Sequence, residues 1–170
     1  MESEPAAAPA IPASTPVDPA ESSRSILLLS GPNLNLLGDR QPEVYGTATL
    51  ADHVATASER ASLAGVVVEH LQSNSESDLV AAVHRGRGVV DAIVVNAGAV
   101  THYGWSLHDA LAAFDGPVVE LHISNPAARE RWRHTSVVSP VADVVIQGAG
   151  GLGYRLAIDA ALGLLGLDLP

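Results

Sequence analysis

The fold of this chain is decided by the stretch Ile26-Leu27-Leu28-Leu29-Ser30-Gly31-Pro32, in which a short apolar run ends at a glycine and a proline. Runs of roughly four to eight apolar residues bounded by turn residues are typical of strands buried on both faces. Further runs rich in valine, isoleucine and leucine follow at residues 66–71, 92–95, 118–122 and 144–146. Because these runs are mostly continuous rather than alternating with polar residues, they predict parallel strands in one sheet with both faces covered.

Helical patterns alternate with these strands. The sequence predicts helices over residues 50–64, 76–87, 106–114 and 153–165, and a short turn after Asn125-Pro126. We expect Gly65 to close the first helix and Ser75 to open the second, with Asp78 three residues later as its capping partner. Alternating strands and helices predict an α/β fold, namely a flavodoxin-like, doubly wound five-stranded parallel sheet in three αβα layers.

Composition sets limits on the chemistry. The chain has 170 residues, of which 47% are hydrophobic, so it is long enough for one domain with a core of its own. All nine basic residues are arginine, and together with 19 acidic residues they give a net charge of −10. The absence of lysine and cysteine excludes Schiff-base catalysis, thiolate nucleophiles, disulfides and cysteine metal sites. An acidic chain has no general attraction for nucleic acid or anionic lipid, so we expect no nucleic-acid partner and no membrane partner.

Residues 1–24 differ in composition from the rest of the chain. They hold five of the eleven prolines, many alanines and serines, and four acidic residues against the single base Arg24. This composition predicts a disordered tail, followed by a single domain over residues 25–170. The tail has neither the features of a secretory signal nor those of a mitochondrial presequence, and no apolar run reaches the length of a membrane span, so we expect a cytoplasmic protein.

The segments that follow the predicted strands carry the polar and cationic residues. Ligands bind beyond the carboxyl ends of the strands in such sheets. Residues 31–46 form the longest segment, far beyond the roughly two to six residues of an ordinary strand-to-helix loop. Because this loop carries apolar residues, Arg40 and Tyr45 rather than serine and glycine, we interpret it as an active-site lid, with a mobile linker as the alternative. Residues 96–102 and 122–126 bring asparagine and histidine to the same edge of the sheet.

Glu120 and His122 are the most informative pair in these segments. They lie two positions apart on a predicted strand, so their side chains project from the same face. A carboxylate beside an imidazole orients it and favours its charged form, which is a good general acid near neutral pH. The alternative is a structural histidine that only satisfies a carboxylate.

The sequence around Asn125 indicates an anion site. We expect Asn125 to cap a short helix, which places the amides of Ile123 and Ser124 at a helix N-terminus where a carboxylate or phosphate is favoured. Arg129 and Arg133 are four residues apart and are expected to share a helical face. Two arginines on one face are also typical of a solvated surface.

Tyr45 and Arg40 form a second candidate pair. A phenol is a poor base at neutral pH, but a nearby guanidinium favours the phenolate, which is a strong base. The alternative is a tyrosine packed under its own loop beside an exposed arginine.

Two further patterns are similar to known cofactor or metal sites. The run Gly148-Ala149-Gly150-Gly151-Leu152-Gly153 fits the spacing of the dinucleotide fingerprint, but residues 154–170 leave no room for the further strand, ending in an acid, that the fingerprint requires. His102 and His108 do not have the spacing of a common zinc motif. We therefore expect no cofactor and no metal.

The chain resembles the type II 3-dehydroquinate dehydratases in several separate motifs, which occur in the family's order and near its spacing. These motifs are Gly31-Pro32-Asn33-Leu34-Asn35-Leu36-Leu37-Gly38 with Arg40, Pro42 and Tyr45-Gly46, then Gln72-Ser73-Asn74, Asn96-Ala97-Gly98 with Thr101-His102, Glu120-Leu121-His122-Ile123-Ser124-Asn125, and Arg129-Glu130 with Arg133. The resemblance covers residues 25–165. It implies a flavodoxin-like fold, a homo-oligomer in the form of a dodecamer built from trimers, no metal or cofactor, and dehydration of 3-dehydroquinate to 3-dehydroshikimate in the shikimate or quinate pathway.

The resemblance also implies a role for each candidate site residue. Tyr45, as a phenolate, removes a proton beside the substrate ketone, and Arg40 favours its ionised form. His122, oriented by Glu120, protonates the departing hydroxyl. By the same resemblance, Asn33 holds a water that stabilises the enolate. The substrate carboxylate is bound by Asn96, Ile123 and Ser124, and ring hydroxyls are bound by His102 and Arg133. Asp109 reaches in from a neighbouring subunit, and Arg129 helps to close the lid.

The sequence departs from the family's pattern at a few positions. Gln41 stands where the family usually has Glu, Tyr103-Gly104 where it has Thr-Ser, and His108 where it has Arg. The last two departures lie on the implied trimer contact. None of them alters the implied acid, base or enolate-stabilising residues.

Two other classes of protein compete with this reading. A flavin-binding electron carrier needs aromatic platforms beside a phosphate loop, and this chain has only six residues of the Phe, Trp and Tyr types. A catalytically inactive scaffold is expected to lack Tyr45, His122 or Arg40, and all three are present.

Overall fold

The computed structural model describes residues 24–39 and 47–167, which form a parallel sheet covered by helices. The strands are β1 (Ser25–Ser30), β2 (Val67–Gln72), β3 (Ala92–Asn96), β4 (Val118–His122) and β5 (Val144–Gln147). They form a five-stranded sheet in the order β2-β1-β3-β4-β5, and every neighbouring pair is parallel. This confirms the predicted flavodoxin-like, doubly wound fold.

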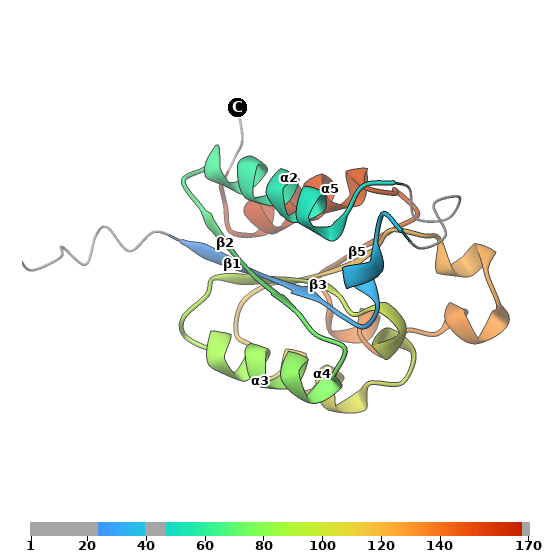
Figure 1. Cartoon of the computed structure of the whole chain (residues 1–170). Helices are drawn as coiled ribbons and strands as arrows, with labels where there is room; N and C mark the ends of the chain where they lie inside the picture. Colours follow the sequence, from blue (N-terminus) through green and yellow to red (C-terminus); the bar gives the residue numbers. More distant parts are fainter. Residues whose placement is uncertain (1–23, 40–46, 168–170) are drawn as a thin grey trace, which may run out of the picture.

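Helices cover both faces of the sheet (Figure 1). Helices α2 (Leu50–Ser62) and α5 (Leu152–Leu164) lie on one face, and α3 (Glu76–Gly86) and α4 (Trp105–Ala112) lie on the other. The predicted strands and helices are all present, with ends that differ by one or two residues from those expected. Short 3-10 helices complete the described chain, namely η2 (Leu34–Leu36), η3 (Gly98–His102), η4 (Pro126–Ala128), η5 (Arg131–His134) and η6 (Ser139–Val141). Within the residues described, no helix is both long enough and apolar enough to span a membrane.

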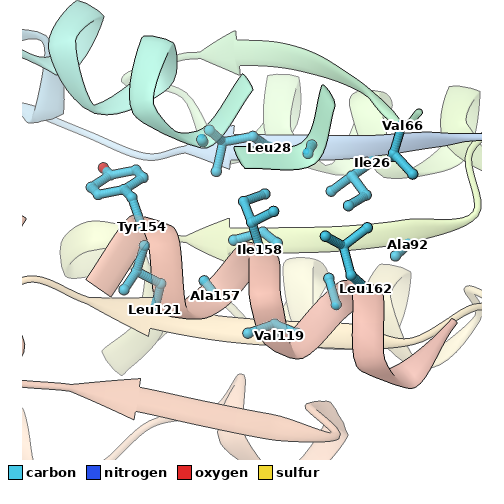
Figure 2. Close-up of a cluster of buried hydrophobic side chains, with 14 of the residues drawn as sticks. Ile26, Leu28, Val66, Ala92, Val119, Leu121, Tyr154, Ala157, Ile158 and Leu162 are labelled. Atoms are coloured by element: carbon cyan, nitrogen blue, oxygen red, sulfur yellow. The ribbon is translucent and has the colours of Figure 1, made fainter. Parts of the chain in front are cut away.

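The core lies between the sheet and its helices. Every residue of β1, β3 and β4 is buried. Figure 2 shows the side chains of Tyr154, Ile158 and Leu162 on α5 directed toward the sheet, where Leu28 of β1 and Leu121 of β4 belong to the same buried cluster. A second buried cluster fills the opposite face beneath α3 and α4. The three central strands, after which the loops of the site begin, are therefore fully packed.

The two edge strands are less buried than the three central strands. Val67 of β2 is 50% exposed and Val145 of β5 is 39% exposed. Both strands lie at the edges of the sheet, where a strand is paired on one side only. An apolar run in the sequence does not distinguish a central strand from an edge strand.

One helix cap differs from the expected one. Ser75 stands at the N-cap of α3, but its side chain makes no capping hydrogen bond. The Ser73 hydroxyl links Ser75 to Asp78 instead, because it donates to Asp78 at 2.6 Å and accepts from the backbone N–H of Ser75 at 3.0 Å. A complete capping box is found at α2, between Thr49 and Asp52.

Packing accounts for the glycine-rich turn between β5 and α5. A Cβ atom at Gly153 would lie 2.7 Å from Cδ1 of Leu121, and one at Gly151 would lie 2.6 Å from the His53 ring. Gly148 has φ +77°, a conformation that favours glycine. The turn therefore needs its glycines in order to bring α5 close to the sheet, whether or not it binds a ligand.

The hydrogen bonding of the sheet begins at Arg24. The carbonyl of Arg24 accepts from the backbone N–H of Val67 at 2.9 Å, and its guanidinium donates to the carbonyl of Leu165 at 2.9 Å. The remainder of the expected tail, residues 1–23, lies outside the described residues, as do residues 40–46 of the expected lid.

Candidate active site

A cavity lies beyond the carboxyl ends of β1, β3 and β4, at the edge of the sheet where this fold predicts a site. Its volume is about 110 Å³. The lining residues are Pro32, Asn33, Leu34, Leu37, Asn96, Gly98, Ala99, His102, His122, Ile123, Ser124, Pro126, Arg129 and Arg133. The structure thus gathers around one cavity nearly all of the candidate site residues that it describes, and the exceptions are Glu120 and Asp109.

Two arginines line the cavity although the chain as a whole is acidic. Arg129 and Arg133 contribute to its wall, and no aspartate or glutamate is among the described residues that line it. The whole chain, by contrast, carries a net charge of −10. A local arrangement of this kind favours an anionic ligand that the protein surface would otherwise repel.

His122 and Glu120 form a buried pair at the end of β4, as the sequence predicts. Nε2 of His122 lies 2.8 Å from Oε1 of Glu120, and both residues are buried. His122 lines the cavity, whereas Glu120 is fully buried behind it. With Nε2 directed to the carboxylate, Nδ1 is the ring nitrogen that remains for a molecule in the cavity.

Glu120 receives three hydroxyl groups in addition to the imidazole. Thr101 and Ser136 each donate to Oε1 at 2.7 Å, and Ser139 donates to Oε2. Burial by itself raises the pKa of Glu120, but the hydrogen bonds from His122, Ser139, Ser136 and Thr101 outweigh it and lower the pKa to about 2. The carboxylate is therefore ionised at neutral pH, and it holds His122 in place as a charged partner.

Asn33 begins the loop after β1 in an unusual conformation. Its φ of 65° is the only positive φ of a non-glycine residue in the described chain. The backbone N–H of Asn33 donates to Oδ1 of Asn74, just beyond β2, at 2.9 Å. At its base the loop is fixed to β3, since the N–H of Gly31 donates to the carbonyl of Asn96 at 2.8 Å.

Asn96 ends β3 beneath the cavity. Its Nδ2 donates to the hydroxyl of Tyr154 at 3.5 Å, and its Oδ1 accepts from the N–H of Gly98 at 3.4 Å. Tyr154 stacks on His53, with ring centroids 4.7 Å apart. Burial raises the pKa of Tyr154 to about 12, against smaller opposing effects of Asn96 and Ser30. Tyr154 is therefore a neutral partner within reach of the Asn96 amide.

The segment after β4 differs from the short helix that the sequence suggests. Asn125 caps a turn as expected, because its side chain accepts from the N–H of Ala127 at 3.1 Å. This turn, η4, is a three-residue 3-10 helix, too short to provide a substantial helix dipole. A guanidinium N–H of Arg129 also reaches the hydroxyl of Ser124, at 3.4 Å. Any preference of this end of the cavity for anions thus comes from individual donors.

Arg129 and Arg133 do not share a helical face, so that expectation is wrong. Arg129 has extended backbone at the end of η4, and Arg133 belongs to the separate turn η5. The two guanidinium groups are brought together by Glu130, which lies 3.6 Å from Arg129 and 2.8 Å from Arg133. The guanidinium of Arg133 also lies over the Trp132 ring, 4.0 Å from its centroid. Both arginines reach the cavity in spite of the different backbone.

His102 enters the cavity from η3. Its Nδ1 lies 2.7 Å from the carbonyl oxygen of Thr135, and its ring meets Trp132 edge to face. These contacts hold η3 against the segment that follows η5.

The other candidate residues lie elsewhere. Asp109 is on the exposed side of α4 and does not line the cavity. Tyr45 and Arg40 fall outside the described residues. His108, one of the departures from the expected pattern, is held by the carbonyl of Val137 at 2.7 Å.

Sequence reasoning missed the hydroxyls on Glu120 and the tyrosine beneath Asn96. Thr101 stands next to His102, which is a weak signal. Ser136 and Ser139 lie 16 and 19 residues from Glu120, and Tyr154 lies 58 residues from Asn96. Nothing in the local sequence pattern marks these three residues.

Comparisons with known proteins agree with this geometry. Residues 24–162 match the family model for dehydroquinase class II. The chain is 54% identical over 134 residues to the 3-dehydroquinate dehydratase 1 of Corynebacterium efficiens, an alignment that covers 79% of this chain and 89% of that protein. It is 50% identical over 139 residues to a catabolic 3-dehydroquinase of Phaeosphaeria nodorum, covering 82% of this chain and 91% of the relative.

A solved structure gives the same result. The type II dehydroquinase from Butyrivibrio crossotus superimposes with a TM-score of 0.80 at 39% identity, and the match covers 82% of this chain and 98% of that one. Sequence and structure agree over the whole region that holds the cavity. The chain belongs to the class II dehydroquinase family.

Proposed function

We propose that this chain is a 3-dehydroquinate dehydratase, a hydro-lyase that removes water from 3-dehydroquinate to give 3-dehydroshikimate through an enolate. The observation that carries the proposal is the His122–Glu120 pair at the wall of a cavity that two arginines also line. An elimination needs an acid for the departing hydroxyl, and an acidic substrate needs cationic walls. The relatives that bear the name of this activity support the choice of substrate.

The reaction divides into two proton transfers. A base breaks the C–H bond beside the ketone and leaves an enolate, and the electrons of the enolate then form the C=C bond as the C–O bond breaks. The departing hydroxyl takes a proton from His122 and leaves as water. His122 suits this role because Nε2 is directed to Glu120 at 2.8 Å, which leaves Nδ1 for the substrate.

The proposed base is Tyr45 as a phenolate, and Arg40 is proposed to favour its ionised form. Both residues lie outside the described residues, so their assignment rests on the sequence motif. Asn33, at the cavity wall, is proposed to hold a water against the enolate oxygen. The base and the acid then come from different loops and act in separate steps.

The remaining lining residues are proposed to bind the substrate. Asn96, Ile123 and Ser124 bind its carboxylate, while His102 and Arg133 bind ring hydroxyls. The two arginines that line the cavity and the Asn96 amide at its wall support these assignments. Arg129 is proposed to close the lid over the bound substrate.

We further propose that the enzyme needs no metal or cofactor, because the acid and the base are its own side chains. It is proposed to work in the cytoplasm as a dodecamer built from trimers, with Asp109 completing the site of a neighbouring subunit. The exposed rings of Tyr103 and Trp105, on the same part of the surface as Asp109, are consistent with a contact there. The relatives include a catabolic enzyme as well as proteins named simply as dehydratases, so this chain is proposed to serve either quinate breakdown or aromatic biosynthesis.

The test is to incubate the purified chain with 3-dehydroquinate and follow the absorbance of a conjugated enone. We expect the absorbance to rise in the presence of a chelator, and His122→Ala to be slower by about 10²–10⁴-fold. Ser62→Ala is a matched control on α2, since the Ser62 hydroxyl bonds only to the neighbouring Glu59 carbonyl among the contacts described. The absence of enone formation by the unmodified chain would contradict the proposed function.

A further inference from the structure

Glu120 is the meeting point of three separate segments of the chain. His122 comes from the same strand, Thr101 comes from η3, and Ser136 and Ser139 come from the segment that ends in η6. All four direct donor groups at the one carboxylate. None of the three hydroxyls belongs to the residues to which the sequence assigns a role in the reaction.

The protons around this carboxylate can be assigned. The hydroxyl oxygen of Ser136 accepts from the backbone N–H groups of Val138 at 3.0 Å and Ser139 at 2.9 Å. Its single proton has two acceptors in reach, the Glu120 carboxylate at 2.7 Å and the Thr101 hydroxyl at 2.9 Å, and the charged, nearer carboxylate is the stronger one. Two backbone dipoles therefore polarise this hydroxyl toward the carboxylate. Oε1 receives three of the four groups, so a proton on that oxygen would face donors only. The surroundings therefore favour the ionised carboxylate.

As the acid, His122 carries a proton on each ring nitrogen, and an ionised Glu120 determines that Nε2 keeps its proton after Nδ1 has given the other to the departing hydroxyl. The carboxylate has no proton to give, so the imidazole donates through Nε2 across the 2.8 Å contact. Nδ1 is then the nitrogen that serves the substrate. If Glu120 turned or became protonated, His122 would lose both its tautomer and its fixed ring orientation.

The same segment also fixes a second residue of the cavity wall. The N–H of Val137 donates to the carbonyl of Thr101 at 2.7 Å, and the carbonyl of Thr135 meets His102 at 2.7 Å. The segment from Thr135 to Ser139 therefore contacts both Glu120 and η3. His122 and His102 are held by one connected network.

We infer that Thr101, Ser136 and Ser139 are positioning residues of the reaction. Their hydroxyls hold Glu120 as an ionised acceptor, and Glu120 in turn keeps Nε2–H of His122 on itself and Nδ1 toward the substrate. This inference rests on the proposed function, in which His122 is the acid. The three hydroxyls act through Glu120 and do not transfer protons to the substrate.

The experiment compares Thr101→Val, Thr101→Ser and Ser139→Ala with the unmodified chain. Valine keeps the shape of threonine but removes the hydroxyl, whereas serine keeps the hydroxyl. We expect kcat to fall roughly 10- to 100-fold in Thr101→Val and Ser139→Ala with little change in KM, because a hydrogen bond to a charged group is lost away from the substrate. We expect Thr101→Ser to retain most of the activity and Ser62→Ala to match the unmodified chain.

The pH profile separates positioning from general stability. Loss of a donor raises the pKa of Glu120, so the acid limb of the kcat profile should move to higher pH in Thr101→Val and Ser139→Ala and stay in place in Thr101→Ser. Ring ¹⁵N spectra in alkaline solution give a readout that does not depend on activity. They should show His122 protonated at Nε2 in the unmodified chain and a mixture of tautomers in the two variants that lack a hydroxyl.

The outcomes separate a failure of the proposed function from a failure of the inference about the three hydroxyls. If the unmodified chain forms no enone, the proposed function fails, while the tautomer spectra still test the inference. If the unmodified chain is active but Thr101→Val and Ser139→Ala keep its kcat, its acid limb and its His122 tautomer, the inference is overturned. Equal impairment of Thr101→Ser and Thr101→Val would also overturn it, because the hydroxyl would then not be the group that matters.

Discussion

The backbone N–H of Asn33 donates to the side chain of Asn74 across 2.9 Å, and this contact ties the loop after β1 to the end of β2. Asn33 has φ 65°, which asparagine adopts more readily than most residues do. The position therefore carries two separate demands, a left-handed backbone and an amide side chain at the cavity wall.

Glycine and alanine at position 33 should separate these demands. We expect Asn33→Gly to keep the folding stability, because glycine adopts positive φ without strain. Asn33→Ala should lose about 1–2 kcal/mol of unfolding free energy from strain. Both variants should lose most of their activity, since both lack the amide. Urea unfolding and the enone assay measure the two effects, and a fully active Asn33→Gly would show that the amide has no chemical role.

Gly153 should tolerate no side chain. Its Cβ would lie 2.7 Å from Cδ1 of Leu121, which is fully buried under α5. We expect Gly153→Ala to lower the unfolding free energy by about 1–3 kcal/mol through overpacking. Gly163→Ala is the matched control in the same helix, because nothing lies within 4 Å of its Cβ position. This control should stabilise the chain slightly, as alanine favours helix by up to about 1 kcal/mol. Equal stabilities of the two variants in urea would contradict the packing explanation.

Tyr154→Phe should weaken substrate binding more than it slows turnover. The Tyr154 hydroxyl accepts from Asn96 at 3.5 Å, near the limit of a hydrogen bond, so its loss should loosen the Asn96 amide without removing it. We expect KM to rise by roughly two- to tenfold with kcat nearly unchanged. Ser62→Ala on α2 is the control and should leave both constants unchanged. A fall in kcat at constant KM for Tyr154→Phe would contradict a role in binding.

Stability should depend on acid pH through Glu120. The pKa of this carboxyl is lowered from 4.5 to about 2 in the folded chain, so its contribution is fully present above about pH 4.5 and is lost as the pH falls toward 2. The shift corresponds to a contribution on the order of 3 kcal/mol. Urea unfolding across this range should show a steep loss of stability in the unmodified chain and a shallower one in Glu120→Gln. Glu59→Gln, an exposed control on α2, should keep the steep loss, and an equally steep loss in Glu120→Gln would show that other groups cause it.

The sequence is informative where one residue type and one short spacing determine the result. Continuous apolar runs predict the strands to within one residue, and the two-residue spacing of Glu120 and His122 predicts their contact at 2.8 Å. It is less informative where the chain takes an unexpected backbone. Arg129 and Arg133 reach the same cavity from two separate 3-10 turns rather than from one helix.

Contacts between distant segments could not be predicted. The hydroxyls of Ser136 and Ser139 reach Glu120 only because η6 packs beside the end of β4, and serine occurs at many other positions in the chain. Edge strands have the same limitation, since the apolar residues of β2 look in the sequence like those of a central strand. In both cases the deciding information is the packing of one segment on another.

The central claim is that Tyr45 removes the proton beside the ketone and His122 protonates the hydroxyl in a later, separate step. The most direct test is to follow by NMR the exchange of that proton of 3-dehydroquinate with deuterated solvent in Tyr45→Phe and His122→Ala. We expect His122→Ala to exchange the proton while forming almost no enone, because the base and the enolate site remain intact. Tyr45→Phe should neither exchange the proton nor form enone. Exchange by Tyr45→Phe at the rate of the unmodified chain would contradict the account, since some other group would then be the base.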